Sequence, residues 1–196
     1  MLNLNNSGTG NANIEANNGV TNAVINAELN NLVINGTNPN ANVRIQGSSG
    51  SGTLVIKNNF EILSIGAGRR VRPFANTIEV GGNWINNVAP SAFQHGNETV
   101  RFVGLNAQTL TAPNQQHFQN LVIDKPNNDL TIDGEVHVFN NLNLTSGNIN
   151  TSSSELIIIR NNATVSNASD ASHINGPCRK VGNQSFTLPI WKNGLL

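Results

Sequence analysis

Four acidic residues lie close together in the second half of the chain: Asp124, Asp129, Asp133 and Glu135. Enzymes that cleave polysaccharides hold two carboxylates a few ångströms apart, as general acid and base. Here Asp129 and Asp133 flank the apolar segment 130–132, and Asp133 with Gly134 forms a common turn pair. We therefore expect solvated corners, no catalytic residue and no enzyme activity. The same acids lack the spacing of an EF-hand or of a Gly-Gly-x-Gly-x-Asp repeat, so we expect no calcium site.

The other candidate metal ligands are four histidines and one cysteine. No histidines have the His-x-x-x-His spacing of a ligand pair, and a single thiol allows neither an internal disulfide nor a cysteine-based zinc site. We expect no metal or cofactor site, and we expect Cys178 to be a small packed residue rather than a nucleophile. Strand alternation between two valines predicts that His137 points away from the core. The histidines are His95, His117, His137 and His173.

One cluster of basic residues stands out, formed by Arg69, Arg70 and Arg72. It could bind an acidic polysaccharide or the carboxylates of a partner, although a solvated loop between strands is the favoured interpretation. The nearby segment Gly66-Ala67-Gly68 lacks the strand-then-helix context of a nucleotide-binding turn, so no phosphate loop is predicted.

Three aromatic residues follow this cluster, and they could form a platform on which sugar rings stack: Phe74, Trp84 and Phe93. A tryptophan in the sequence Gly-Asn-Trp is more often a large side chain packed at a corner of a core. We expect Trp84 to be buried in this way.

The composition limits what these residues can do. The 196 residues include 11 basic and 11 acidic side chains, which gives a formal net charge of zero. Without an excess of positive charge or a long apolar run, the chain is expected neither to bind nucleic acid nor to insert into a membrane. The hydrophobic fraction of 37% is sufficient for one core. Asparagine accounts for 38 residues, and this excess needs a structural explanation.

Short strands, rather than helices, must position the candidate residues. Apolar residues recur at every second position in short runs, and these runs are separated by Asn, Gly, Ser, Thr and Pro, which favour turns. The predicted strands cover residues 32–34, 43–45, 54–56, 60–65, 78–80, 100–103, 121–123, 130–132, 136–138, 142–144 and 156–159.

Asn-Asn pairs repeat within this pattern. The unit apolar-x-Asn-Asn-apolar-x-apolar occurs at 56–62, 138–144 and 159–165, with looser copies around Asn30 and Asn86. Such a recurring unit indicates a repeat architecture, in which each copy occupies an equivalent place.

The spacing of the repeat gives the length of one turn. The step from Leu32 to Leu54 nearly equals the step from Leu121 to Leu142, whereas the steps between the copies at Asn30, Asn58 and Asn86 are longer. The shorter step, a period near 21 or 22, fits one turn of a three-sided solenoid. The longer steps predict that some turns carry loop insertions.

Within such a solenoid, one Asn of each pair would adopt a left-handed backbone conformation at the corner, and the other would stack on the equivalent Asn one turn away. We predict an all-β fold, a right-handed parallel β-helix with irregular turns and Asn-rich corners. An antiparallel sandwich rich in asparagine is the alternative.

From about residue 76 onward, a series of segments follows in a recognisable order: 80–84, 99–104, 107–110, 118–123, 142–150, 172–177 and 182–190. Together they resemble a β-helical repeat module of large type IX-secreted, adhesin-like surface proteins of Bacteroidetes-type bacteria. Two residues depart from that pattern: Trp191, where glycine is expected, and Cys178, where an aliphatic residue is usual. Residues 1–75 resemble the generic turns that precede the module.

The resemblance implies a right-handed parallel β-helix displayed outside the cell. We expect residues 1–196 to form a single domain, a fragment of a longer chain, acting as a non-catalytic structural or adhesin-like module. A carbohydrate-binding or polysaccharide-cleaving β-helix is the alternative. An extracellular glycan or another surface protein is the expected partner. A stripe of outward apolar residues could contact such a partner, and it comprises Val33, Val55, Val122 and either Ile157 or Ile158.

Overall fold

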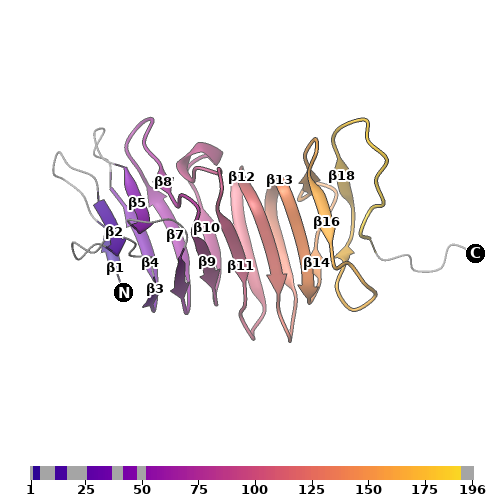
Figure 1. The fold of residues 1–196 in the computed structure, drawn as a ribbon, viewed down its shortest axis with the longest axis horizontal. Coiled ribbons are helices and arrows are strands. Elements are labelled where there is room, and N and C mark those ends of the chain that lie inside the picture. Colours follow the sequence, from indigo (N-terminus) through magenta and orange to yellow (C-terminus); the bar gives the residue numbers. More distant parts are fainter. Residues whose placement is uncertain (1, 5–11, 17–25, 37–41, 48–51, 191–196) are drawn as a thin grey trace, which may run out of the picture.

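The short apolar segments form parallel strands that stack turn upon turn. The computed structural model describes residues 2–4, 12–16, 26–36, 42–47 and 52–190, and Trp191 lies outside this part of the chain. These residues form a parallel β-solenoid of about six turns (Figure 1). Every pair of named strands is parallel, which confirms the predicted solenoid and excludes the antiparallel sandwich. In the described part of the chain, no helix has the length and apolar character of a membrane span.

The solenoid has three faces, each a ladder of parallel strands. On the first face, Leu32 pairs with Phe60, Phe60 with Trp84, and Trp84 with Leu110. The strands of this face are β1 (Leu2–Leu4), β4 (Leu32–Asn35), β7 (Phe60–Ser64), β10 (Trp84–Asn86), the first segments of β12 (Gln108–Asp124) and β13 (Leu130–Ser146), β14 (Ile149–Asn150) and β17 (Ile174–Asn175).

The second face follows the same pattern. Leu121 pairs with Leu142, which confirms the prediction that these two leucines lie one turn apart. Its strands are β3 (Asn26–Leu29), β6 (Thr53–Ile56), β9 (Thr77–Val80), β11 (Thr99–Phe102), the last segments of β12 and β13, and β16 (Thr164–Ser166).

The third face is interrupted at one turn. There the 3-10 turn η1 (Pro90–Ala92) replaces a strand, and Phe93 alone bridges to Val71. The strands of this face are β2 (Ala12–Ala16), β5 (Val43–Gly47), β8 (Val71–Arg72), the middle segments of β12 and β13, β15 (Ile157–Ile159) and β18 (Cys178–Lys180).

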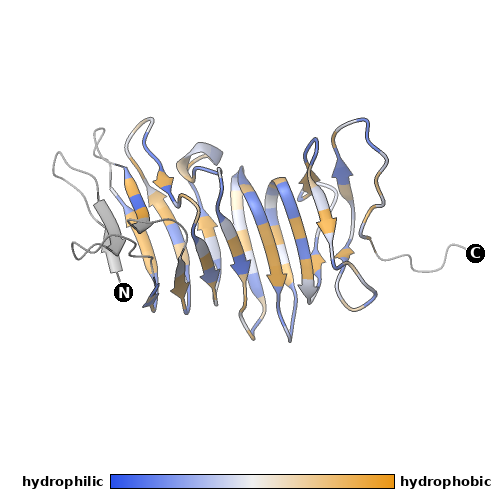
Figure 2. Ribbon diagram, viewed as in Figure 1, coloured by the Kyte–Doolittle hydropathy of each residue, from blue (hydrophilic) through white to orange (hydrophobic). Residues whose placement is uncertain are grey.

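The core is a narrow apolar column between the three faces. Side chains alternate between core and solvent, so apolar and polar positions alternate along the strands in Figure 2. Where η1 interrupts the third face, aromatic rings fill the core. Trp84 is fully buried, stacks on Phe60 with ring centroids 4.0 Å apart, and meets Phe93 and Phe118 edge-on. The predicted burial of Trp84 is therefore confirmed.

Asparagines connect successive turns at the corner before the first face. The side-chain oxygen of Asn31 accepts the backbone N–H of Asn59 at 3.1 Å, that of Asn59 accepts from Asn83 at 2.9 Å, and that of Asn83 accepts from Thr109 at 2.9 Å. Elsewhere asparagine side chains pair directly across turns, with an N···O distance of 2.7 Å between Asn140 and Asn120, although the residue paired with Asn120 in the ladder is Asn141 rather than Asn140. The bonds accepted by Asn31, Asn59 and Asn83 satisfy backbone donors that the turns leave unpaired.

The left-handed role predicted for the Asn pairs holds at one of the three clean copies. Asn162 has a φ of 64°, whereas Asn58, Asn59, Asn140 and Asn141 are not among the described residues with positive φ. At those corners the chain turns without a left-handed Asn, and the side chains act through hydrogen bonds between turns.

Two of the predicted turn equivalences are wrong. Leu32 and Leu54 lie on different faces, since Leu54 pairs with Ile78 on the second. The backbone N–H of Gly82 donates to Asn58, so Gly82 rather than Asn86 is one turn from Asn58. Asn86 instead lies fully buried within β10. An Asn-Asn pair marks a corner, but it does not reveal which of the three corners it occupies.

Gly134 provides a test of the corner inside β13. Its φ is +122°, and an added Cβ would lie 2.1 Å from the carbonyl oxygen of Ala112. We expect Gly134→Ala to lower the free energy of unfolding by about 2–3 kcal/mol, because it combines backbone strain with a clash against backbone that cannot yield. Urea denaturation of the full chain measures this loss. Gly96→Ala is the control, because that added Cβ would meet nothing within 4 Å; equal losses for both variants would contradict the prediction.

Candidate functional site

The four acids that could form a catalytic pair are distributed over the three faces of the solenoid. Asp133 belongs to the first face, where it pairs with Thr111. Asp129, at the corner before that face, accepts the backbone N–H of Asn148 at 3.1 Å. Asp124 ends β12 on the second face. Glu135 lies at the third face, 2.5 Å from His137. The fold does not bring these four carboxylates together as a general acid and base.

Asp124 belongs to an ion-pair network on the second face. Arg101 lies between Asp124 and Glu79 and contacts both carboxylates, with an N···O distance of 2.7 Å to Glu79. The guanidinium of Arg101 holds the pKa of Asp124 below its usual range. Asp124 is therefore ionised at neutral pH and is neutralised by its neighbour, which suits a structural bridge across turns.

Three histidines, separated by about one turn in sequence, meet on the third face. His117 pairs with His137 in neighbouring strands, and their ring centroids lie 4.9 Å apart. The ring of His95 lies 5.6 Å from that of His117 and stacks on Phe139 at 4.1 Å. His137 points away from the core as predicted, yet it is only 7% exposed because these rings cover it. His173 lies apart from them, at the corner before β17.

Two histidines of the cluster, His95 and His117, are neutral at pH 7. Burial lowers the pKa of His117 to about 4, and His137, His95 and Arg160 lower it further. Burial also lowers the pKa of His95. No group of three or more His, Cys, Asp or Glu side chains in the described residues has a geometry that could hold a metal ion.

Arginines collect along the third face and its borders. Arg44 and Arg72 are paired in adjacent strands, and Arg179 lies on the same ladder beside Ile158. Arg70 directly precedes β8, and Arg160 directly follows β15. With Arg69, this set contains six of the seven arginines in the chain. We call it the arginine face, defined by Arg44, Arg69, Arg70, Arg72, Arg160 and Arg179.

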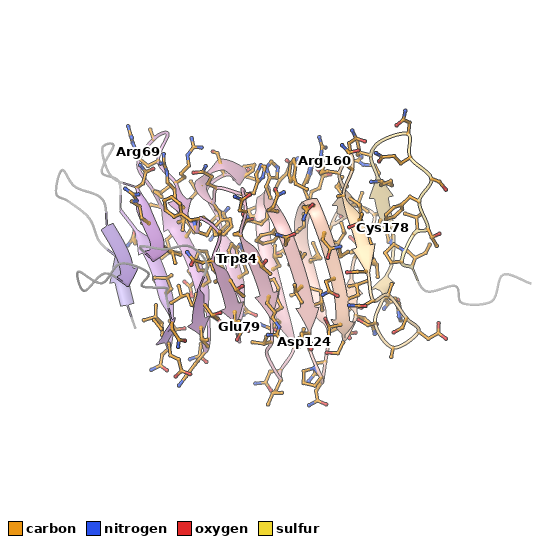
Figure 3. The ribbon with its side chains drawn as sticks, in the orientation of Figure 1. Arg69, Glu79, Trp84, Asp124, Arg160 and Cys178 are labelled. Carbon is orange, nitrogen blue, oxygen red and sulfur yellow. The ribbon has the colours of Figure 1, made fainter. Side chains whose placement is uncertain are left out.

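The arginines of the solenoid gather on one side although the formal charges of the chain sum to zero. Figure 3 shows Arg69 and Arg160 along one long edge of the molecule, and Glu79 and Asp124 along the opposite edge. On the arginine face, Glu135 contacts His137 and Arg179, and Glu155 lies at the border with its carboxylate against Ser152. The sequence prediction treated Arg69, Arg70 and Arg72 as one isolated loop cluster. The structure extends that cluster along the solenoid axis.

A hollow interrupts the arginine face next to η1. It has a volume of about 370 Å³ and is lined by Arg70, Ser91, Gln94, His95 and His117, with Pro90 and Phe93. Within the described residues, several buried nitrogens of this region have no hydrogen-bond partner: Arg70 Nε, Arg72 Nε, His95 Nδ1 and His117 Nε2. The Nε–H groups of the two arginines are donors, and each neutral imidazole carries one N–H donor, so this hollow is suited to a ligand that carries acceptor oxygens.

The remaining candidates do not form a site. Trp84 and Phe93 are fully buried, so the sugar-stacking platform is wrong, although Phe74 is 41% exposed. Burial raises the pKa of the Cys178 thiol to about 11, which opposes a nucleophilic role. The segment from Gly66 to Arg69 forms a turn, in which the backbone N–H of Arg69 donates to the Gly66 carbonyl.

The outward apolar positions do not form one stripe. Val33 belongs to the first face, Val55 and Val122 to the second, and Ile158 to the third. Ile158 is outward beside His137 and still fully buried, while Ile157 points into the core. The predicted lateral contact surface along these residues is therefore wrong.

Glu98 is a buried ionisable residue that sequence reasoning missed. It lies at the corner between the third and second faces, is fully buried, and accepts the backbone N–H groups of Gly96 and Gln119 at 2.6 and 2.7 Å. Burial raises its pKa to about 7. Its sequence, Gly-Asn-Glu-Thr, is typical of an exposed turn and gives no indication of burial.

Glu98 and His117 have opposite effects on stability between pH 5 and 7. The folded pKa of Glu98 is raised, so acidification stabilises the fold through it, by about 2 kcal/mol over this range. The folded pKa of His117 is depressed, so acidification destabilises the fold through it, by at most about 2 kcal/mol. We expect Glu98→Gln to lose more stability on acidification than the natural chain. Guanidinium denaturation at pH 5 and 7 measures this difference, and an unchanged pH dependence would contradict it.

No family model, curated protein or solved structure matches this chain.

Proposed function

We propose that the chain is a non-catalytic structural and adhesin-like module displayed outside a bacterial cell. The observation that carries this proposal is the continuous parallel ladder, in which each turn packs on the next over a shared apolar column. Such a solenoid is an elongated support on which binding surfaces are arranged along one axis. The segments that resemble modules of secreted surface proteins support the extracellular location.

The distribution of the acids supports a non-catalytic role over polysaccharide cleavage. General acid and base groups must lie together at one cleft, and Asp124, Asp133 and Glu135 belong to different faces. Glu98 has a raised pKa, which a general acid requires, but its side chain is fully buried and its carboxylate is bound to backbone N–H groups.

Adhesion and cleavage can be measured in one experiment. Beads carrying the covalently attached full chain are passed over surfaces coated with neutral or acidic polysaccharides, and the eluate is assayed for new reducing ends and unsaturated sugars. We expect the beads to be retained on at least one surface while the polysaccharide stays intact. Detection of cleavage products in the eluate would show that the chain is an enzyme that cleaves the polysaccharide. Failure of the beads to be retained on any surface would refute the adhesive role.

A further inference from the structure

The arginine face has the properties of a binding surface for a long anionic ligand. Arg44 and Arg72 occupy paired positions in adjacent strands, which lie about 4.8 Å apart in a β-sheet. This spacing is close to the length of one pyranose ring along a polysaccharide chain. A ligand with one negative charge on each sugar could therefore meet Arg44 and Arg72 with successive sugars.

Three of these arginines have guanidinium groups that are not neutralised by an acidic neighbour. Among the residues that the structure describes, no carboxylate lies within salt-bridge distance of Arg70, Arg72 or Arg160. The Nε atoms of Arg70 and Arg72 also lack hydrogen-bond partners. By contrast, Arg101 on the second face is paired with two carboxylates. Arginine therefore has different roles on the two faces. On the second face it bridges neighbouring turns, whereas on the arginine face its N–H donors remain available to a ligand.

The hollow beside η1 supplies a defined position along this surface. Arg70, His95 and His117 line it, and each has a buried nitrogen without a partner. A guanidinium binds the oxygens of a carboxylate or sulfate through charge-assisted hydrogen bonds, and a neutral imidazole adds one N–H donor. One anionic substituent of a sugar chain would satisfy these donors together.

We propose that the arginine face binds an acidic polysaccharide lying along the solenoid axis, with one carboxylate or sulfate group held in the hollow by Arg70, His95 and His117. This inference rests on the proposed adhesive function and gives its ligand a chemical class. Arg72 and Arg44 bind the anionic groups that follow toward the N-terminal turns, and Arg160 binds on the opposite side of the hollow.

Two other polyanionic or acidic partners fit this surface less well. Single-stranded nucleic acid needs exposed aromatic rings for base stacking, but Trp84 and Phe93 are buried and Phe74 lies under the guanidinium of Arg44 at 5.3 Å. A protein partner usually requires an apolar centre in the interface. Among the described residues near the arginine face, Phe74 is the large hydrophobic side chain that is exposed, and one such side chain does not form an apolar centre.

Binding of defined polymers to the full chain tests the proposal. Biolayer interferometry compares a carboxylated polymer (polygalacturonate), a sulfated polymer (dextran sulfate), neutral dextran and a single-stranded DNA of similar charge. We expect binding to at least one of the two acidic polysaccharides and none to dextran. The carboxylated and sulfated polymers distinguish which anionic group the hollow accepts. Equal or tighter binding of DNA would overturn the polysaccharide assignment, as would binding to neutral dextran alone.

A matched pair of variants locates the binding surface. Arg70→Gln and Lys57→Gln each remove one positive charge, but Lys57 is an exposed residue paired with Glu28 away from the arginine face. We expect Arg70→Gln to weaken binding of the acidic polymer about tenfold and Lys57→Gln to leave it within about twofold. Circular dichroism checks that both variants are folded, and Arg72→Gln replaces Arg70→Gln if the latter is not. Equal effects at the two sites would refute the assignment to this face.

The bead experiment separates this inference from the adhesive function. If beads carrying the natural chain attach to neutral surfaces but to no acidic one, adhesion stands and the anionic ligand is wrong. If these beads attach to no surface, both are wrong.

Discussion

Trp84→Ala is expected to lower the free energy of unfolding by about 4 kcal/mol, a loss typical of a large aromatic side chain removed from a packed core. Trp84 is fully buried, and its ring packs against Phe60, Phe93 and Phe118. Alanine leaves a cavity that these rings cannot fill, because Phe60 and Phe118 are held in the ladders of their faces and the surrounding core is closely packed. Urea denaturation of the full chain, followed by circular dichroism, measures the loss.

Two control variants separate the contributions at this position. Trp84→Phe keeps a ring but removes the Nε1–H that donates to Gln116 Oε1 at 3.0 Å, so a smaller loss of about 1–2 kcal/mol is expected. Phe74→Ala removes an aromatic ring that is 41% exposed and should cost less than about 1 kcal/mol. If Trp84→Ala cost no more than Phe74→Ala, the aromatic cluster would not be the centre of the core.

Lys125→Met should have the second largest effect, with a loss of about 3 kcal/mol. Lys125 is 1% exposed, and its Nζ donates to the carbonyl oxygens of Gly104 and Asn106, both at 2.8 Å, and to Gln108 Oε1 at 2.7 Å. Burial lowers its pKa to about 8, so the ammonium remains charged at neutral pH. Methionine has a similar shape but leaves these three acceptors without their donor.

The matched control for Lys125 is Lys57→Met. Lys57 forms an ion pair with Glu28 at 2.7 Å, but both side chains are more than half exposed, and such pairs contribute little. We expect its loss to stay below about 0.5 kcal/mol. Thermal melting of both variants at pH 7 provides the comparison. Similar melting temperatures for the two variants would mean that the Lys125 ammonium does not hold the corner together.

Local patterns in the sequence were sufficient to predict the strands but not their places in the solenoid. Alternating apolar residues marked β4, β6, β7 and β9, because a half-buried strand requires that pattern. The early part of β12, with its glutamines and threonines, was missed since its strand character comes from pairing with β10 and β13. Asn-Asn pairs occur at more than one kind of corner, so their spacing alone could not assign Leu54 to its face.

The candidate site depended on information that sequence order hides. The arginine face draws on residues from Arg44 to Arg179, and a net charge averages them with acids that lie on other faces. The histidine cluster had one readable signal, because the steps from His95 to His117 and from His117 to His137 are nearly equal and close to one turn. Equal spacing at the turn length indicates proximity in a solenoid, whereas the local spacing used for zinc sites does not detect it.

The length of each turn varies while the faces stay aligned. On the first face, the chain is much longer between the paired residues Leu32 and Phe60 than between the paired residues Leu130 and Ile149. The strands β4, β5 and β6 of this longer turn still pair with the next turn, so the ladder does not depend on the extra residues between them. Corners are therefore sites at which this architecture can gain or lose segments, and new surface loops can arise there without redesign of the scaffold.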